Sequence, residues 1–253
     1  MFSEPDGNFP NGVPNPMKSE NQMPTRVKVL EFGANLGVAF DGDFDRCFIC
    51  DEEGNFIEGE YIVALLSEIF LKREVGATII HDPRIIWAIQ EVVRKNGGNF
   101  VQSVTGHAFF KEKIRKSNAI YGGEMSAHHY FRDFCFCDSG MIPWLIIVEF
   151  MSAKNLPLSE IIKGIRTSFP SSGEINFDVR DGKAAMVRIS EYFGEAALCK
   201  DESDGLILTF KDWRLNIRQS QTEPLIRLNI ESRGNRELIT KKLDEINTLI
   251  RDY

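Results

Sequence analysis

Long hydrophobic runs, clusters of basic residues and paired cysteines are all missing from this sequence. The most apolar stretch, Met141 to Met151, contains Pro143 and Glu149 and is too short to cross a bilayer. No run of five or more basic residues occurs and the net charge is −7, which argues against a general nucleic-acid-binding surface. The first residues have neither the basic nor the apolar region of a signal peptide. We therefore expect a cytoplasmic protein without a membrane or nucleic-acid partner.

The five cysteines are odd in number and scattered, which is typical of reduced thiols and not of a disulfide framework. Cys47-x-x-Cys50 and Cys135-x-Cys137 could bind zinc only if the fold joined them, and neither pair has a partner at the usual spacing. With 253 residues, 43% of them hydrophobic and 26% charged, the chain is ordinary globular material for one large or two modest domains.

Proline is concentrated at the beginning, where the first 24 residues hold five of the ten prolines. Such a segment is extended and rich in turns. A helix over about 24–32 and a strand over 36–40 follow. This first strand has too few neighbours for a stable parallel sheet, so we expect that the chain starts inside a domain.

Three carboxylates at alternate positions, Asp41, Asp43 and Asp45, form a turn between two apolar runs. Hard oxygen ligands of this kind suit Mg²⁺, Mn²⁺ or Ca²⁺. An acidic surface turn is the alternative. An EF-hand is excluded because the position that needs glycine is Arg46 and an apolar, strand-like run follows.

Strand and helix patterns alternate through the middle of the chain. We predict strands over 77–81, 100–104 and 119–122 and helices over 60–72, 84–95 and 108–115, which together indicate a parallel sheet. Ligands of such sheets bind beyond the carboxyl ends of the strands. Polar residues gather there in three successive loops: His81-Asp82-Pro83-Arg84, Thr105-Gly106-His107 and Gly122 to His129. Taken singly, each loop has a simpler explanation, as a helix cap or as the site of a core histidine. Three such loops after three successive strands favour a polyhydroxyl or phosphate ligand.

The remaining patterns change character. Helices over 140–153 and 158–166 precede an expected linker over 169–173, and hairpin signals then predict a small α+β domain with an antiparallel sheet. Its strands are expected over 174–179, 206–210, 213–217 and 225–231, and its helices over 183–193 and 235–251. The loop Arg218-Gln219-Ser220-Gln221-Thr222-Glu223-Pro224 offers a guanidinium and two hydroxyls that could cradle a phosphate, unless it is an ordinary polar hairpin tip.

Three motifs, in this order and at this separation, resemble the α-D-phosphohexomutase family: Asp41-Gly42-Asp43-Phe44-Asp45-Arg46, Gly123-Glu124-Met125-Ser126, and Arg218 to Pro224. Within the family the likeness is to the bacterial phosphomannomutases, and it covers essentially the whole chain. The resemblance implies three domains. Residues 1–55 would form a partial α/β domain 2, which carries the metal-binding loop. Residues 56–167 would form a parallel-sheet α/β domain 3 with the sugar-binding loop, and residues 168–253 a small α+β domain 4 with the phosphate-binding loop.

The resemblance also implies roles for individual residues. Asp41, Asp43 and Asp45 would ligate Mg²⁺, and Arg46 would lie against the reactive phosphate. Glu124 and Ser126 would bind sugar hydroxyls, while Arg84 and His107 would assist at the sugar and its phosphate. The non-reacting phosphate would be bound by Arg218, Ser220, Gln221 and Thr222, although Gln221 departs from the Gly or Asn more usual there.

The activity implied is Mg²⁺-dependent interconversion of mannose 6-phosphate and mannose 1-phosphate through a sugar bisphosphate and a phosphoserine. The family's nucleophile lies in a Ser-His-Asn motif, and none occurs in these 253 residues. We therefore expect an N-terminally truncated form, poorly active alone, that could pair with a separate N-terminal half. A glucose or glucosamine specificity and a non-catalytic sugar-phosphate-binding remnant remain as alternatives.

Overall fold

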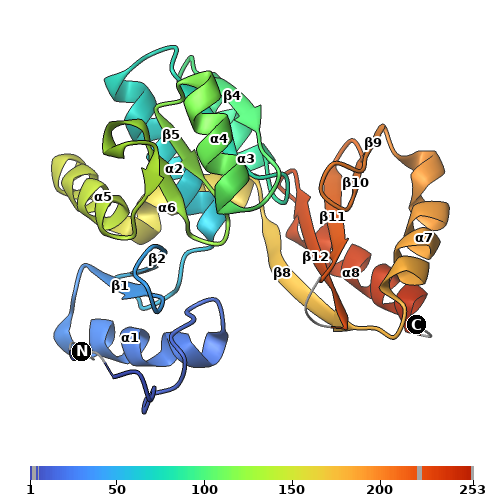
Figure 1. The fold of residues 1–253 in the computed structure, drawn as a ribbon, viewed down its shortest axis with the longest axis horizontal. Helices are drawn as coiled ribbons and strands as arrows, with labels where there is room; N and C mark the ends of the chain where they lie inside the picture. Colours follow the sequence, from blue (N-terminus) through green and yellow to red (C-terminus); the bar gives the residue numbers. More distant parts are fainter. Residues whose placement is uncertain (2–3, 5, 221–223, 252–253) are drawn as a thin grey trace.

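The computed structural model describes residues 1, 4, 6–220 and 224–251 of the chain. Three units follow one another along the sequence (Figure 1): a hairpin unit containing α1 to β2, an α/β unit containing α2 to α6, and an α+β unit containing β8 to α8. In the view of Figure 1 the hairpin unit lies below the α/β unit and the α+β unit lies to its right, and β8 carries the chain into the α+β unit.

The hairpin unit consists of α1 (Ser19–Phe32), β1 (Leu36–Phe40) and β2 (Cys47–Asp51), with the two strands antiparallel and Phe40 opposite Cys47. Gly37 allows α1 to lie against the strands, because a Cβ there would be only 2.5 Å from the Cys50 Sγ and from a Val29 methyl group. The helix begins five residues earlier than predicted. Pro24 lies inside it and does not start it, and water can reach the carbonyl left without an N–H on this exposed helix.

The α/β unit has a five-stranded sheet in the order β4-β3-β5-β6-β7. Strands β3, β4 and β5 are parallel, as predicted, while β6 and β7 add an antiparallel edge. The sequence patterns missed β6 and β7, which are only three and two residues long and, unlike β5, do not follow an α-helix. The bounds of the elements are α2 (Gly59–Arg73), β3 (Thr78–His81), α3 (Trp87–Lys95), β4 (Asn99–Gln102), α4 (His107–Ser117), β5 (Tyr121–Gly123), β6 (His129–Phe131), η1 (Arg132–Phe134), β7 (Cys137–Asp138), α5 (Met141–Lys154) and α6 (Leu158–Ser168).

Consecutive side chains of β3 point into different cores. Ile79 belongs to a large core formed with α2, α3, α5 and α6, which Cys47 and Ile49 of β2 also enter. Ile80 packs on the other face against Phe110 and other apolar residues around α4. The sheet is therefore covered on both faces, as expected for an α/β unit, and the hairpin unit is anchored to its core.

The α+β unit has an antiparallel sheet in the order β8-β12-β11-β10-β9. The expected linker over 169–173 is wrong in its second half, because β8 begins at Ser171 and pairs with β12. The three-residue strand β9 was not predicted. The bounds are β8 (Ser171–Asp178), α7 (Gly182–Phe193), η2 (Gly194–Ala196), β9 (Cys199–Asp201), β10 (Leu206–Thr209), β11 (Trp213–Gln219), β12 (Leu225–Ser232) and α8 (Arg236–Ile250).

The two faces of this sheet have different partners. Leu215 and Ile217 of β11 and Leu228 of β12 pack with α7 and α8 in one core. The alternate residues of β11 and β12, among them Arg214 and Glu231, lie on the opposite, polar face. Arg214 reaches the α/β unit from that face, since its Nη1 donates to the Arg84 carbonyl at 2.8 Å. The polar face of the sheet is thus buried against the neighbouring unit.

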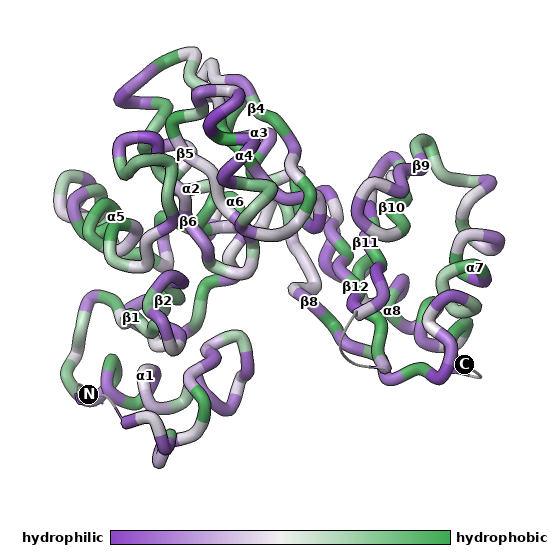
Figure 2. The backbone as a smooth tube through the Cα atoms, in the orientation of Figure 1, coloured by the Kyte–Doolittle hydropathy of each residue, from purple (hydrophilic) through white to green (hydrophobic). Residues whose placement is uncertain are grey.

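Hydrophobic residues occupy most of α5, the most apolar helix of the chain (Figure 2). At 14 residues it is too short to cross a membrane. Among the described residues, no helix is both long enough and apolar enough to do so.

Candidate functional site

The turn between β1 and β2 brings the three predicted metal ligands together. One carboxylate oxygen from each of Asp41, Asp43 and Asp45 lies within 4.8 Å of the others. Asp41 is buried, Asp45 is half-buried and Asp43 is exposed. Phe44 takes a left-handed backbone conformation with φ of 62° between the second and third aspartate, which tightens the loop.

Electrostatics within the loop differ from one aspartate to the next. Burial alone would raise the pKa of Asp41, but hydrogen bonds from Arg46, whose Nε lies 2.6 Å from the Asp41 Oδ2, hold that pKa below its usual value. Burial and the neighbouring carboxylates Asp41 and Asp43 raise the pKa of Asp45, against the opposing effect of His128. Arg46 therefore lies folded onto the metal-binding loop.

The donor set fits a hard divalent cation. The Asp45 Oδ1 is buried and has no hydrogen-bond partner among the residues that the structure describes. A buried carboxylate oxygen without a donor costs free energy unless a cation or water meets it. Three clustered carboxylates and one unsatisfied oxygen match the ligands that Mg²⁺ prefers.

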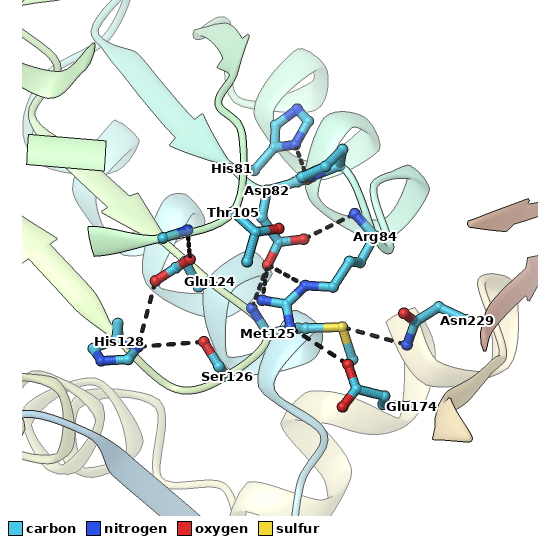
Figure 3. Close-up of polar contacts among 12 residues, drawn as sticks. His81, Asp82, Arg84, Thr105, Glu124, Met125, Ser126, His128, Glu174 and Asn229 are labelled. Carbon is cyan, nitrogen blue, oxygen red and sulfur yellow. Dashed lines mark hydrogen bonds and ion pairs between the residues drawn. The ribbon is translucent and has the colours of Figure 1, made fainter. Parts of the chain in front are cut away.

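The residues that follow the sugar loop, Gly123 to Ser126, pair with the residues at the end of the metal-binding loop, Asp41 to Arg46. The Cys47 N–H donates to the Ala127 carbonyl at 3.1 Å, and Arg46 forms an isolated β-bridge with His128. The His128 Nε2 lies 3.4 Å from the Asp45 Oδ2, while its Nδ1 lies 3.3 Å from the Glu124 Oε2. His128 thus connects the two loops, and Figure 3 shows its contacts with Glu124 and Ser126 on the sugar-loop side.

Glu124 is almost completely buried, with 1% of its surface exposed. Its carboxylate accepts hydrogen bonds from the Gly106 N–H at 2.8 Å and from the Tyr130 hydroxyl at 3.0 Å. The Ser126 Oγ lies 3.3 Å from the His128 Nδ1. His107 begins α4 directly after Gly106 and is exposed, so the Gly106 contact with Glu124 brings the start of α4 to the sugar loop.

Arg84 is held by Asp82 in the loop after β3 (Figure 3). The Asp82 Oδ2 accepts from the Arg84 Nη2 at 2.6 Å and from the Met125 N–H at 2.8 Å, so one carboxylate fixes both Arg84 and the sugar loop. Burial opposes ionisation, but the Arg84 guanidinium keeps the pKa of Asp82 below its usual value. The predicted helix start at Arg84 is therefore wrong: residues 82–86 form this loop, and α3 begins at Trp87.

Arg218 is the predicted phosphate ligand at the end of β11. Its Nη2 donates to the Glu174 Oε2 at 2.9 Å, and the same carboxylate oxygen is 3.8 Å from the Arg84 Nη1. Ser220 follows, with its N–H bonded to the Leu225 carbonyl at 2.9 Å. Gln221 and Thr222 lie outside the described residues.

Sequence reasoning assigned no role to His128, Asp82 or Glu174, although each joins predicted site residues. His128 and Asp82 lay in loops that the patterns singled out, so their position after a strand was an available signal. Glu174 had none, because its contacts cross between segments far apart in the sequence. His81 and His129 are core histidines, which was the alternative to ligand binding. His81 is buried and bonds the Asp82 carbonyl, and His129 is buried and bonds the Tyr121 hydroxyl.

Gly59, the first residue of α2, lies against the sugar loop. A Cβ there would be 2.2 Å from the Met125 carbonyl oxygen. We expect Gly59→Ala to destabilise the protein by about 1–3 kcal/mol because backbone has to shift. Gly164→Ala in α6 is the matched control: its Cβ meets nothing within 4 Å, and about 0.5–1 kcal/mol of stabilisation is expected. Urea denaturation measures both, and an unchanged midpoint for Gly59→Ala would contradict the close contact.

Comparisons with known proteins cover nearly all of the chain. Residues 1–54 match the model of "Phosphoglucomutase/phosphomannomutase, alpha/beta/alpha domain II", residues 58–169 that of domain III, and residues 174–249 that of the C-terminal domain. A phosphomannomutase of Salmonella montevideo is 54% identical over 99% of this chain and 55% of its own length. One of Vibrio cholerae is 55% identical over 99% of this chain and 54% of its own.

A solved structure agrees with these matches. The phosphoglucomutase/phosphomannomutase family protein of Burkholderia thailandensis is 28% identical, with a TM-score of 0.84, over 100% of this chain and 54% of its own. The chain thus spans about half the length of the relatives that it matches.

Proposed function

Because this chain belongs to the phosphoglucomutase/phosphomannomutase family, we propose that it forms the cation-, sugar- and phosphate-binding part of a phosphomannomutase. Such an enzyme interconverts mannose 6-phosphate and mannose 1-phosphate through a sugar bisphosphate. The division into domains at 1–55, 56–167 and 168–253, the dependence on Mg²⁺ and a cytoplasmic location belong to the same proposal.

One observation carries the proposal: predicted site residues from three units, among them Asp45, Glu124, Arg84 and Arg218, lie along one connected series of polar contacts. His128 joins the metal-binding loop to Glu124. Asp82 joins the sugar loop to Arg84, and Glu174 joins Arg84 to Arg218. A continuous arrangement of carboxylates, hydroxyls and guanidinium groups suits a ligand that carries both hydroxyls and phosphate.

Each group has a distinct task in this proposal. Asp41, Asp43 and Asp45 hold Mg²⁺, which when bound neutralises charge on a transferring phosphoryl group. Glu124 accepts hydrogen bonds from sugar hydroxyls beside Ser126. Arg218 and Ser220 bind the phosphate that does not react, together with Gln221 and Thr222.

Four further groups complete the site. Arg46, at the end of the metal-binding loop, faces the reacting phosphate. Arg84 and His107 assist at the sugar and its phosphate, and His128 holds Asp45 and Glu124 together at the junction of the two loops.

The nucleophile is not part of this machinery. No Ser-His-Asn sequence occurs in the 253 residues, so we propose that the phosphoserine comes from residues outside them. Those residues belong either to a longer protein or to a separate N-terminal chain. This chain alone is then expected to bind sugar phosphates and to turn them over little.

Ligand-dependent stabilisation tests the proposal. At a concentration one hundred times the dissociation constant, Mg²⁺ should add about 2.7 kcal/mol to the free energy of unfolding. Addition of α-D-mannose 1-phosphate should add a further increment. The double variant Asp43→Asn, Asp45→Asn should lose the Mg²⁺ effect, whereas Asp133→Asn, at an exposed carboxylate far from the loop in sequence, should keep it.

Thermal unfolding with glucose 1-phosphate and glucosamine 1-phosphate in parallel reports the sugar preference. A chain that neither Mg²⁺ nor any hexose phosphate stabilises would overturn the proposed function. So would a Mg²⁺ effect of equal size in the double variant.

A further inference from the structure

Glu174 of β8 is approached by three guanidinium groups from three different segments. The Arg218 Nη2 lies 2.9 Å from its Oε2, the Arg84 Nη1 lies 3.8 Å from the same oxygen, and the Arg227 Nη1 lies 3.7 Å from its Oε1. The carboxylate is largely buried, with 11% of its side chain exposed. It is therefore the meeting point of these three cations.

The sheet explains why this position needs a negative charge. Arg218 and Arg227 are directly opposite each other in the pairing of β11 with β12, and like charges in that relation destabilise a sheet. Asn176 is the residue of β8 that pairs with Arg227, and Glu174 lies two residues before it on the same face. Its carboxylate is thus a diagonal neighbour of Arg227, while the Arg218 side chain reaches it from β11, on the far side of β12, and it neutralises part of the charge of both.

Arg84 brings the second unit into this contact (Figure 3). Its Nε and Nη2 are bound by Asp82, which leaves its Nη1 directed toward Glu174. Nearby, the Asn229 Nδ2 lies 3.5 Å from the Met125 Sδ of the sugar loop. Glu174 therefore connects the guanidinium at the phosphate loop with the guanidinium at the sugar loop.

We infer that Glu174 is a positioning residue, which holds the Arg218 guanidinium in the orientation that binds the phosphate of a sugar phosphate. This inference rests on the proposed function and adds a residue to it. A guanidinium has five N–H donors and the Arg218 bond to Glu174 is made by its Nη2, so Arg218 keeps donors for a phosphate. Because the side chain of Arg218 is already held by Glu174, less rotamer freedom is lost when the phosphate arrives.

The sign of a substitution effect separates positioning from simple electrostatics. By Coulomb's law alone, removing a carboxylate next to an anion-binding site should strengthen anion binding. If Glu174 acts by positioning, removing it should weaken binding although the site becomes more positive. We expect Glu174→Ala to bind α-D-mannose 1-phosphate about tenfold more weakly, and Glu174→Gln, which keeps a carbonyl acceptor, to lie in between.

Calorimetric titration of the whole chain with α-D-mannose 1-phosphate and with inorganic phosphate measures the effect. Glu74→Gln is the matched control, because it removes a carboxylate ion-paired at 2.6 Å with Arg132 on the surface of the α/β unit. It should leave both affinities unchanged. Equal or tighter binding by Glu174→Ala overturns the inference while leaving the proposed function intact.

The motion of the Arg218 guanidinium can be measured without a ligand, and it tests the positioning role of Glu174 even if no ligand binds. The Nε–H signal of Arg218, assigned by its absence in Arg218→Lys, should report restricted motion of the guanidinium in the unchanged chain and free motion in Glu174→Ala. Unchanged side-chain dynamics in Glu174→Ala would overturn the inference. Failure of the unchanged chain to bind either anion would instead overturn the proposed function.

Discussion

Replacing Glu231 by glutamine is expected to lower the free energy of unfolding by about 3–5 kcal/mol, because it leaves the Arg214 guanidinium as an unpaired charge inside the protein. The two side chains are 2% and 0% exposed and lie 3.0 Å apart. Glu231 also accepts hydrogen bonds from the N–H groups of Ile86 at 3.0 Å and Trp87 at 2.8 Å. The loss therefore falls on the contact between the α/β and α+β units.

Hydrogen exchange localises the effect. The amides of Ile86 and Trp87 should lose protection in Glu231→Gln before the core amides of β3 do, since their acceptor becomes a neutral amide. Urea denaturation followed by tryptophan fluorescence gives the overall loss, with Trp87 on one side of the contact and Trp213 on the other. Glu74→Gln, in an exposed ion pair, should leave the midpoint almost unchanged.

A double-mutant cycle completes this test. Arg214→Met combined with Glu231→Gln should be less destabilised than the sum of the two single variants, because no buried charge is left without its partner. Strictly additive losses would show that the two residues act independently, and the buried pair would then not be what joins the units.

The α+β unit shows how far the sequence could predict the fold. The alternation in β11 and β12, Arg-Leu-Asn-Ile-Arg and Arg-Leu-Asn-Ile-Glu, correctly predicts strands with one apolar face. It also suggests that the polar face meets water. Instead Arg214, Asn216, Asn229 and Glu231 are buried, because that face packs on the neighbouring unit. An alternating pattern shows which face of a strand is polar. It does not show whether water or another part of the protein covers that face.

The candidate site was predictable to a similar extent. The spacing of Asp41, Asp43 and Asp45 predicted their convergence, since three alternate residues of one short turn have few ways to separate. The contacts of His128 with Asp45 and of Glu174 with Arg84 depend on how units pack, and no local pattern contains that information. The late start of α3 has the same origin, because Glu231, far along the chain, accepts from its first N–H groups.

Glu60 is the second residue for which a large effect is expected, and it depends on pH. Its carboxyl group is fully buried in the first turn of α2 and accepts from the Ser171 hydroxyl of β8. Its Oε2 has no hydrogen-bond partner in the described part of the chain. Burial raises the pKa of Glu60 to about 7; the Ser171 hydrogen bond opposes this rise, and the charges of Glu58 and Asp82 add to it.

The direction of the pH dependence follows from this shift. A carboxyl group with a pKa of about 7 when folded and 4.5 when unfolded keeps its proton longer in the folded state. Its stabilising contribution is complete below pH 4.5 and is lost as the pH rises through about 7. A difference of this size corresponds to about 3 kcal/mol between the two limits.

Glu60→Gln should remove this contribution, because the amide does not ionise. We expect the variant to gain stability relative to the unchanged chain as the pH rises from 5 to 8, while Glu191→Gln, at an exposed carboxylate of α7, should show no such gain. Comparing each variant with the unchanged chain at every pH cancels the acid effects of Asp82 and the other carboxylates. The pH dependence of the ¹³C shift of the Glu60 carboxyl gives its pKa directly. A pKa near 4.5 would show that water reaches this carboxyl group, and the contact between α2 and β8 at Ser171 would then not exclude water.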